Sequence, residues 1–581
     1  MHRRTETTAA EQLAASYRRL RRLNDVVDPA RLATDPQLLA AMHEWTAPLD
    51  GALTVLAGIH YNLFLGTLHD HDPLEERPLD EFHRMDRIGT FLCTELAHGN
   101  NAHALETVAD YDHDNGTFTL HTPHLGAQKF MPNTSLAGGP KSAVVAARLR
   151  VDDRDRGVLL FLVPLTDEIG TLPGVTVRSL PLRPGSPIDH CLTSFDRVVL
   201  PRESLLTGVH GRLSGDGTLT SAYSSKRKQF LAAIGRVTVG KLCMTASALG
   251  GARAALATAV RYAHHRKISG ARPDDFIPLW GHRTHHGPLL KSLATVYAMT
   301  ALHRATVARW VDRDPTDSEA VAAAERQTAI TKGWSTWQAR NVIVESRERC
   351  GAQGMMPPNG IISMLSDVEG TITAEGDNLA LWCKAAAELL LGAETPAPAI
   401  RDDETTGRDL VDPVVRQALL AEAAHLHLAR ARERAREIPD GDRLQRWNAA
   451  APDALVAVTA RAEHDAAAAL LGWAAAADDA ARPVLLDLHQ LFTVERIDNH
   501  SSLLLGAQKL TVGQADMLSA MQESSIRRLA EYGIPLVDAF DLPEEFFAGR
   551  PISNPTYQQA FTADVVGWDP TPSSSELLAP V

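Results

Sequence analysis

The stretches SAVVAARLRV, residues 142–151, and GVLLFLVPL, residues 157–165, decide the fold. Both are short β-branched or apolar runs, a pattern typical of strands. Glycine and proline punctuate the sequence on either side, at Gly138-Gly139-Pro140 and at Leu172-Pro173-Gly174. The pattern therefore predicts β structure with short connections.

Three further runs extend this β region. Residues Thr117–Thr122 alternate polar and apolar side chains after Asp114-Asn115-Gly116, which is a good hairpin signal. Gly174–Leu180 and Cys191–Leu200 are short apolar or β-branched runs of the same kind. We therefore predict a central, β-barrel-like domain over residues 89–215.

Helical patterns flank the β domain on both sides. Residues 1–88 are rich in alanine and leucine without strand alternation, which predicts an N-terminal helical domain. Residues 216–395 predict a helical bundle, and the long periodic runs in it are Gly235–His265, Leu289–Asp312 and Ser318–Arg349. A proline-rich linker is expected at Glu394–Pro398, and residues 396–581 predict a second, C-terminal helical bundle. The predicted fold class is a multidomain α+β protein.

The composition excludes several classes of protein. The 581 residues carry 58 Lys and Arg against 71 Asp and Glu, a net charge of −13, whereas proteins that bind nucleic acid are usually basic. The five cysteines form no CxxC pair, which argues against structural zinc and against a disulfide framework. No run reaches the roughly 18 apolar residues of a membrane span. Because neither a secretory signal nor a Ser-Lys-Leu ending is visible, the sequence predicts a cytoplasmic protein.

Familiar nucleotide and metal motifs are missing from the sequence. No GxGxxG opens a helix after a strand, and there is no Walker spacing and no HExxH. His282 and His286 would share one face of a helix and could hold a metal. No carboxylate lies nearby to complete such a site, so a surface or interface cluster is favoured and we expect no metal.

Five short segments carry the chemical information, and they follow one another in a fixed order. They are TELAHGNN at 94–101, KFMPNT at 129–134, RYAHHR at 261–266, CGAQG at 350–354 and TAEGDN at 373–378. In order and spacing they resemble the motifs of the acyl-CoA oxidases, relatives of the acyl-CoA dehydrogenases, and the chain is identified as a member of that family, of the bacterial type. The resemblance continues at Leu504–Leu510 and Tyr532–Pro543.

The resemblance implies a flavoenzyme. It would use FAD to oxidise an acyl-CoA, or another acyl-carrier thioester, to the trans-2-enoyl thioester, and it would pass the electrons to O2 to give H2O2. It also implies a homodimer in which each FAD bridges two subunits. Two alternatives stay open: a dehydrogenase that passes electrons to a carrier protein, and a non-catalytic paralogue that binds flavin or acyl thioester.

Glu375 matches the glutamate of the family's E-G-D/E-N motif and is therefore the candidate catalytic base. The α proton of an acyl thioester is only weakly acidic, so its removal needs a positioned base. A carboxylate held away from water beside the substrate has a raised pKa and can serve. Taken alone, Glu375 would be an ordinary exposed glutamate at a helix start, but the matched context favours the base.

The same matching assigns the contacts with cofactor and substrate. The cofactor-binding residues would be Thr94, Phe130, Asn133, Arg266, His286, Gly351, Gln353 and Asn378, and the substrate-binding residues Gly99, Asn100 and Gly376. Thr94 would hydrogen-bond the flavin ring. Arg266 would reach the FAD pyrophosphate of the neighbouring subunit, since a guanidinium fork fits phosphate oxygens.

The sequence departs from the family pattern where flavin and acyl chain should lie. Phe130 and Met131 replace paired tryptophans, and Asn133 replaces a glycine. The other replacements are Lys267-Ile268-Ser269 for Arg-Gln-Phe, Ala352-Gln353 for Gly-His, and His282–His286 for a glutamine-rich helix. These changes leave the class intact and predict a specialised substrate.

Overall fold

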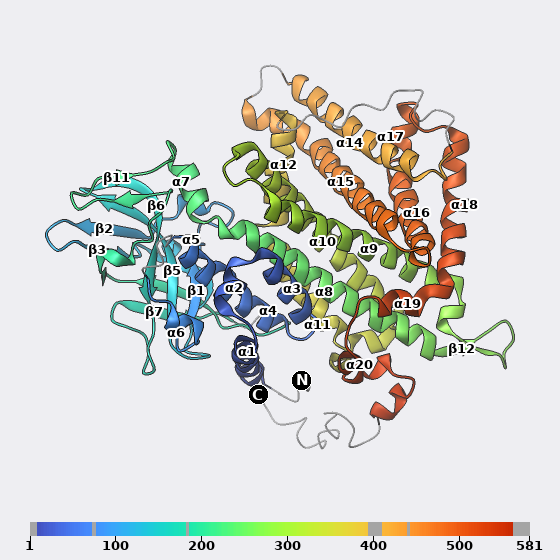
Figure 1. Ribbon diagram of the computed structural model, residues 1–581, viewed down its shortest axis with the longest axis horizontal. Helices are drawn as coiled ribbons and strands as arrows, with labels where there is room; N and C mark the ends of the chain where they lie inside the picture. The colour runs from blue at the N-terminus through green and yellow to red at the C-terminus, as the bar shows by residue number, and fades with distance from the viewer. Residues whose placement is uncertain (1–7, 72–76, 182–184, 393–408, 439–441, 562–581) are drawn as a thin grey trace. The chain divides into compact units, whose positions relative to one another are not determined.

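A computed structural model describes residues 8–71, 77–181, 185–392, 409–438 and 442–561 (Figure 1). The predicted linker at Glu394–Pro398 lies outside the described residues. By their internal contacts the residues form two compact units. Among the described residues, one comprises residues 8–247 together with 373–380, and the other comprises residues 248–372 together with those from 381 to 561. Each unit is described by itself.

The first unit begins with short helices. They are α1 (Ala9–Asn24), α2 (Pro29–Thr34), α3 (Pro36–Thr46), α4 (Gly51–Ala57), the π-helix η1 (Gly58–Gly66), α5 (Thr67–Asp70) and α6 (Asp80–His83). Aspartates cap the N-termini of α2, α3 and α4. The carboxylates of Asp28, Asp35 and Asp50 accept hydrogen bonds from backbone N–H groups of the first turn. These caps explain why helices form here without long periodic runs.

One helical stretch of this unit is apolar and long. By length and composition Gly51–Asp70 could span a membrane, and the bent pair α7 (Lys226–Ala233) and α8 (Arg236–His265) passes the same test when its two helices are taken together. However, 78% of the apolar window in Gly51–Asp70 is buried inside the protein. Such burial is usual for a helix in the core of a domain.

The β structure of the first unit consists of two principal sheets (Figure 1). The larger has the order β1-β5-β2-β3-β9, with β6 also paired to β5, and the smaller has the order β4-β8-β7. The bounds are β1 (Ile88–Leu92), β2 (Val108–Asp112), β3 (Thr117–His121), β4 (Lys129–Asn133), β5 (Lys141–Val151), β6 (Arg154–Pro164), β7 (Val175–Ser179), β8 (His190–Phe195) and β9 (Val198–Leu200). The predicted hairpin is β2–β3, and the predicted runs at 142–151 and 157–165 are β5 and β6. The α+β fold class is thus confirmed.

The central strand explains the apolar stretch that decides the fold. β5 pairs in parallel with β1 and β2 and antiparallel with β6, so the sheet curls around it. The first seven residues of β5 are all buried. A strand covered on both faces carries a continuous apolar run rather than an alternating one.

The predicted strand Cys191–Leu200 is two strands in the structure. It divides into β8 and β9 at Asp196-Arg197, where Arg197 has a φ of +49°. A residue in the left-handed region breaks the extended path, and β9 then pairs with β3 instead of β7. Four further strands are only two or three residues long: β10 (Arg212–Leu213), β11 (Leu219–Thr220), β12 (Lys267–Ser269) and β13 (Phe276–Pro278).

Helices make up most of the described residues of the second unit. α8 begins in the first unit and continues into this one, followed by α9 (Arg283–Asp312), α10 (Ser318–Arg349), α11 (Ile361–Thr373) and α12 (Asn378–Leu390). The C-terminal helices are α14 (Pro413–Arg436), α15 (Arg443–Ala476), α16 (Ala481–Asn499), α17 (Ser501–Gly506), α18 (Val512–Leu529), α19 (Gly533–Asp538) and α20 (Glu544–Ala548). α14 packs along α15 (Figure 1). One apolar core joins the two predicted bundles, with Trp334 and Phe492 in edge contact inside it.

A buried lysine ties helix α1 to the β sheets of the first unit. The Nζ of Lys141 donates to the hydroxyl of Tyr17 at 2.8 Å, to the carbonyl of Asn133 at 2.8 Å and to Oδ2 of Asp189 at 2.6 Å. The Lys141 side chain is fully buried and that of Asp189 is nearly so. This ion pair is therefore well hydrogen-bonded, as a buried charge must be.

Candidate active site

Glu375 lies on a strained turn between α11 and α12. Its φ is +57° although it is not glycine, and Gly376 follows with a φ of +96°. Non-glycine residues in the left-handed region cost about 1–3 kcal/mol and cluster at functional sites. The turn is closed by Asp377, whose carboxylate accepts from the backbone N–H of Leu379 at 3.0 Å at the start of α12. The backbone therefore holds Glu375 in one direction.

The carboxyl group of Glu375 occupies a notch in helix α8. The notch is at Gly240: a β-carbon there would overlap the side chain of Glu375, whose atoms are the three nearest to it. The negative charge of Glu375 also reaches two thiols. Burial, with help from this charge, raises the pKa of Cys243, and burial raises the pKa of Cys93 to about 11 with smaller contributions that include Glu375. Glu375 therefore lies among Gly240, Cys243 and Cys93.

Thr94 and Phe130 are joined by the backbone next to Cys93. The N–H of Phe130 donates to the carbonyl of Thr94 at 2.9 Å, and Glu95 forms an antiparallel bridge with Lys129. Thr94 is exposed and Phe130 is half-buried. Within the first unit, the structure thus brings the predicted base, through Cys93, close to two predicted flavin contacts.

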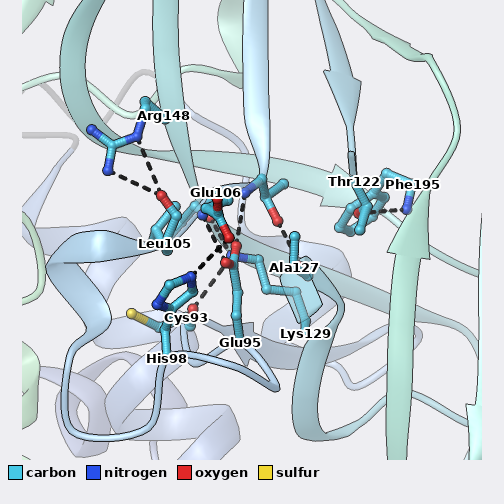
Figure 2. A network of polar contacts seen from close by, with 12 residues as sticks. Cys93, Glu95, His98, Leu105, Glu106, Thr122, Ala127, Lys129, Arg148 and Phe195 are labelled. Carbon is cyan, nitrogen blue, oxygen red and sulfur yellow. Dashed lines mark hydrogen bonds and ion pairs between the residues drawn. The ribbon is translucent and has the colours of Figure 1, made fainter. Parts of the chain in front are cut away.

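A fully buried ion pair underlies this backbone contact (Figure 2). The Nζ of Lys129 lies 3.0 Å from Oε1 of Glu95, and it also donates to the carbonyls of Cys93 at 3.3 Å and Ala146 at 2.8 Å. Glu95 in turn accepts from the N–H groups of Glu106 at 2.7 Å and Thr107 at 2.8 Å. Burial alone would raise the pKa of Glu95, but the Lys129 charge and these hydrogen bonds outweigh it and lower the pKa.

Two of the three predicted substrate contacts, Gly99 and Asn100, lie on the loop that follows Glu95, whereas the third, Gly376, lies next to Glu375. Gly99 and Asn100 are exposed, and Asn100 has a φ of +55°. At the end of this loop, one carboxylate oxygen of Glu106, Oε2, contacts two histidines: it lies 2.9 Å from Nε2 of His98 and 3.0 Å from Nε2 of His124. Hydrogen bonds to these two imidazoles lower the pKa of Glu106.

Two predicted cofactor residues are buried. The side-chain oxygen of Asn133 accepts from the hydroxyl of Thr90 at 2.6 Å, and its nitrogen donates to the hydroxyl of Tyr17 at 3.3 Å. Asn378 is fully buried at the first residue of α12. The structure therefore gives the Asn133 amide a role inside the first unit.

The remaining predicted cofactor residues belong to the second unit. A cavity of about 630 Å³ is lined by Arg266, Gly351, Gln353 and His285, together with Arg349. Gly351 has a φ of +55°, a conformation that glycine adopts without strain. Because glycine has no side chain, its backbone is open to the cavity. The side-chain nitrogen of Asn359 holds Gln353, donating to its carbonyl at 2.9 Å. The motif match predicts His286 as a cofactor contact, whereas its neighbour His285 lines the cavity.

His285 presents a half-buried imidazole to this cavity. Burial, helped by the Arg349 charge, lowers the pKa of His285 to about 4. Among the described residues its Nε2 has no hydrogen-bond partner. A buried polar atom of this kind favours a ligand as its partner. His286 instead contacts the carbonyl of Trp280 through Nδ1 at 2.8 Å. In the described parts of the chain, no group of three or more His, Cys, Asp or Glu is placed to hold a metal.

Comparison with known families fits this arrangement. The model for the C-alpha1 domain of acyl-CoA oxidases matches residues 234–390, and the acyl-CoA oxidase model matches residues 413–548. The chain belongs to the acyl-CoA oxidase family. The two matches cover the α8–α12 region that carries Glu375 and the C-terminal helices.

Individual acyl-CoA oxidases are similar over different lengths. The chain is 30% identical to the mouse (Mus musculus) acyl-coenzyme A oxidase-like protein, over 59% of this chain and 55% of that protein. It is 29% identical to peroxisomal acyl-coenzyme A oxidase 2 of Arabidopsis thaliana, over 62% and 53%. It is 25% identical to acyl-coenzyme A oxidase 1 of Yarrowia lipolytica, over 90% and 81%. The chain thus spans about half the length of the first two relatives.

Solved acyl-CoA oxidase structures share the fold. Acyl-CoA oxidase 1 of Yarrowia lipolytica superposes with a TM-score of 0.84 at 22% identity, over 98% of this chain and 89% of that chain. Acyl-CoA oxidase 2 of Caenorhabditis elegans, bound with FAD, ascaroside-CoA and ATP, superposes with a TM-score of 0.78 at 20% identity, over 98% and 95%.

Two predictions are corrected by the acyl-CoA oxidase relatives. The prediction of a cytoplasmic protein is wrong, because relatives such as oxidase 2 of Arabidopsis thaliana and oxidase 3 of Homo sapiens are named as peroxisomal. The bacterial type also finds no support, since the relatives named here come from yeast, plants and mammals. Address signals and subfamily differences occupy few residues, so composition and core motifs do not reveal them.

Proposed function

We propose that this protein is an FAD-dependent acyl-CoA oxidase, which converts an acyl-CoA to the trans-2-enoyl-CoA and reduces O2 to H2O2. The observation that carries the proposal is the Glu375 carboxyl group in the Gly240 notch, beside the segment that contains Cys93 and Thr94. A carboxylate on a strained turn, next to the exposed Thr94–Phe130 edge, suits proton removal from a substrate held there.

The chain's own residues would carry the proton and hold the reactants. Glu375 would take the proton from the α carbon of the thioester while the hydrogen of the β carbon leaves with its electron pair. The loop with Gly99 and Asn100 would contact the acyl thioester. The saturated C–C bond then becomes a double bond, and the two electrons removed reduce one O2 to H2O2 with two protons.

The residues present fit FAD as the acceptor of that hydride. Thr94 and Phe130 would hold the ring system in the first unit. In the second unit, Arg266 and the unpartnered His285 Nε2 line a cavity suited to a phosphate-bearing ligand, because both offer N–H donors to phosphate oxygens. When bound, FAD would accept the hydride and return the electrons to O2, which no side chain can do. The FAD and ascaroside-CoA named in the Caenorhabditis elegans neighbour support this choice.

We further propose a homodimer in which the two sets of residues act on the same FAD from different chains. Thr94 and Phe130 of one chain would meet the ring, and Arg266, Gly351 and Gln353 of the other chain would meet the phosphates. A two-fold symmetric dimer would contain two such sites.

The purified protein is expected to be yellow, to contain one FAD per chain and to be dimeric. The expectation follows because neither set of residues alone would cover the whole cofactor. Visible absorbance after removal of unbound FAD gives the stoichiometry, and light scattering gives the mass. A folded protein that takes up no FAD would refute the cofactor, and a monomer that holds FAD tightly would refute the shared site.

Gly240→Ala is expected to slow flavin reduction by an acyl-CoA about 10²-fold, the effect of a small misplacement of a catalytic group. The new methyl group would take the space of the Glu375 carboxyl and push the base aside. Folding should survive, because alanine favours helix interiors more than glycine does and the displaced atoms belong to a flexible side chain. The matched control is Gly472→Ala in α15, where nothing lies within 4 Å of the added methyl. Wild-type reduction rates in Gly240→Ala would show that the notch does not position the base.

A further inference from the structure

The ion pair between Lys129 and Glu95 (Figure 2) is next to Thr94 in the chain, in the segment proposed to meet flavin and substrate. Both side chains are fully buried, so neither can touch a ligand. Removing two charges from water costs free energy, and apolar residues of similar size would avoid that cost. The pair is therefore expected to have a role that such residues could not fill. The hydrogen bonds around the pair show what that is.

Lys129 fixes both neighbours of Thr94. Its ammonium donates to the carbonyl of Cys93, the residue before Thr94, and pairs with the carboxylate of Glu95, the residue after it. A third hydrogen bond, to the carbonyl of Ala146, anchors the ammonium to the central strand β5. The N–H of Phe130, next to Lys129 in the chain, holds Thr94 itself. Thr94 is thus fixed from two sides while its side chain stays exposed.

Glu95 closes the loop that follows Thr94. Its carboxylate accepts the N–H groups of Glu106 and Thr107, at the far end of the loop that carries Gly99 and Asn100. A neutral or rotated side chain could not accept these two hydrogen bonds and face an ammonium at once. The carboxylate therefore sets the base of the loop.

Arg148 holds the far arm of the same loop. Its guanidinium donates to the carbonyl of Leu105 at 3.0 Å and to that of His103 at 3.1 Å. These contacts do not depend on Lys129. Loss of the ion pair would therefore release the junction of the loop with Thr94 while Leu105 stays attached.

We propose that Lys129 and Glu95 are positioning residues that set the distance between Thr94 and the Gly99–Asn100 segment, and so between flavin ring and acyl thioester. The proposal rests on the proposed function. The buried pair would thereby set the distance between the flavin ring, which accepts the hydride, and the β carbon of the thioester, which donates it.

Hydrogen–deuterium exchange on the full-length protein without added FAD tests the positioning directly. In Glu95→Gln and Lys129→Met, the amides of Glu106 and Thr107 should exchange about 10–100-fold faster, as expected when hydrogen bonds to a charged group are lost. The matched control is Asp189→Asn, which breaks the buried pair with Lys141 elsewhere in the same unit. Unchanged exchange at Glu106 and Thr107 in both test variants, or equal acceleration in the control, would overturn the proposal.

The double variant Glu95→Gln/Lys129→Met separates positioning from mere stability. It leaves no unpaired buried charge, so its thermal midpoint should recover relative to Lys129→Met. If the pair positions the site, the double variant still shows rapid loop exchange, a shifted visible spectrum of bound FAD and flavin reduction slowed about 10²-fold. If recovery of stability also restores the spectrum and the rate, the pair is only structural. A wild type that takes up no FAD, or is not reduced by any acyl-CoA, refutes the proposed function, whereas the exchange result stands apart from it.

Discussion

Glu375→Gln is expected to keep its fold and its FAD and to lose proton abstraction. The amide is nearly the same size as the carboxyl group, so it should still fit the Gly240 notch. Flavin reduction by an acyl-CoA should fall by at least about 10²–10⁴-fold, the usual contribution of a positioned general base. The loss could be larger, because departure of the hydride is coupled to removal of the α proton.

Anaerobic stopped-flow bleaching of the oxidised flavin measures this effect without involving oxygen. Glu369→Gln is a suitable control, because Glu369 lies on α11 before the strained turn and contacts Arg340 at 3.7 Å. That variant should bleach at the wild-type rate. Near-normal bleaching in Glu375→Gln would mean that another group takes the proton.

Lys141→Met is expected to lower the free energy of unfolding by about 3–5 kcal/mol, the usual cost of breaking a buried ion pair by removing one partner. The change leaves the Asp189 carboxylate buried without its cation, and it removes the hydrogen bonds from Lys141 to Tyr17 and to the Asn133 carbonyl. Helix α1 should therefore detach from the β sheets more readily.

Chemical denaturation followed by circular dichroism measures the loss. The control is Arg84→Met, because the ion pair of Arg84 with Asp86 is mostly exposed and such pairs contribute at most about 1 kcal/mol. If Lys141→Met unfolds at the same denaturant concentration as Arg84→Met, the buried lysine does not hold α1 in place.

The long elements of the fold could be predicted because their signals are local. The helix Ser318–Arg349 has the predicted bounds, and the hairpin follows the Asp114-Asn115-Gly116 turn. β1 and β4 were not predicted as strands. β4 contains Pro132 and has an irregular register with β8. It is extended because it pairs with β8, and its own residues have little preference for a strand.

The candidate site could be predicted only in part. Matching the motifs selected Glu375, Thr94 and Phe130, and the structure joins them in one unit. Gly240 could not be found in this way, because its importance depends on a side chain more than a hundred residues away in the sequence. Lys129 and Glu95 stood inside the quoted motifs without a role, since burial of a charge pair becomes visible only when both strands are placed. The local sequence signal for this ion pair was Lys129, a charged residue at the start of β4.

The most direct test is to mix the FAD-loaded wild-type protein with short, medium and long saturated acyl-CoAs, first without oxygen and then with it. The proposed oxidase should bleach its flavin anaerobically with at least one chain length. On admission of oxygen it should recover its colour and release one H2O2 and one trans-2-enoyl-CoA for each acyl-CoA consumed. Bleaching that oxygen reverses only slowly, without peroxide, would contradict the oxidase and favour a dehydrogenase that needs a carrier protein. Absence of bleaching with every acyl-CoA would contradict catalysis on acyl-CoA altogether.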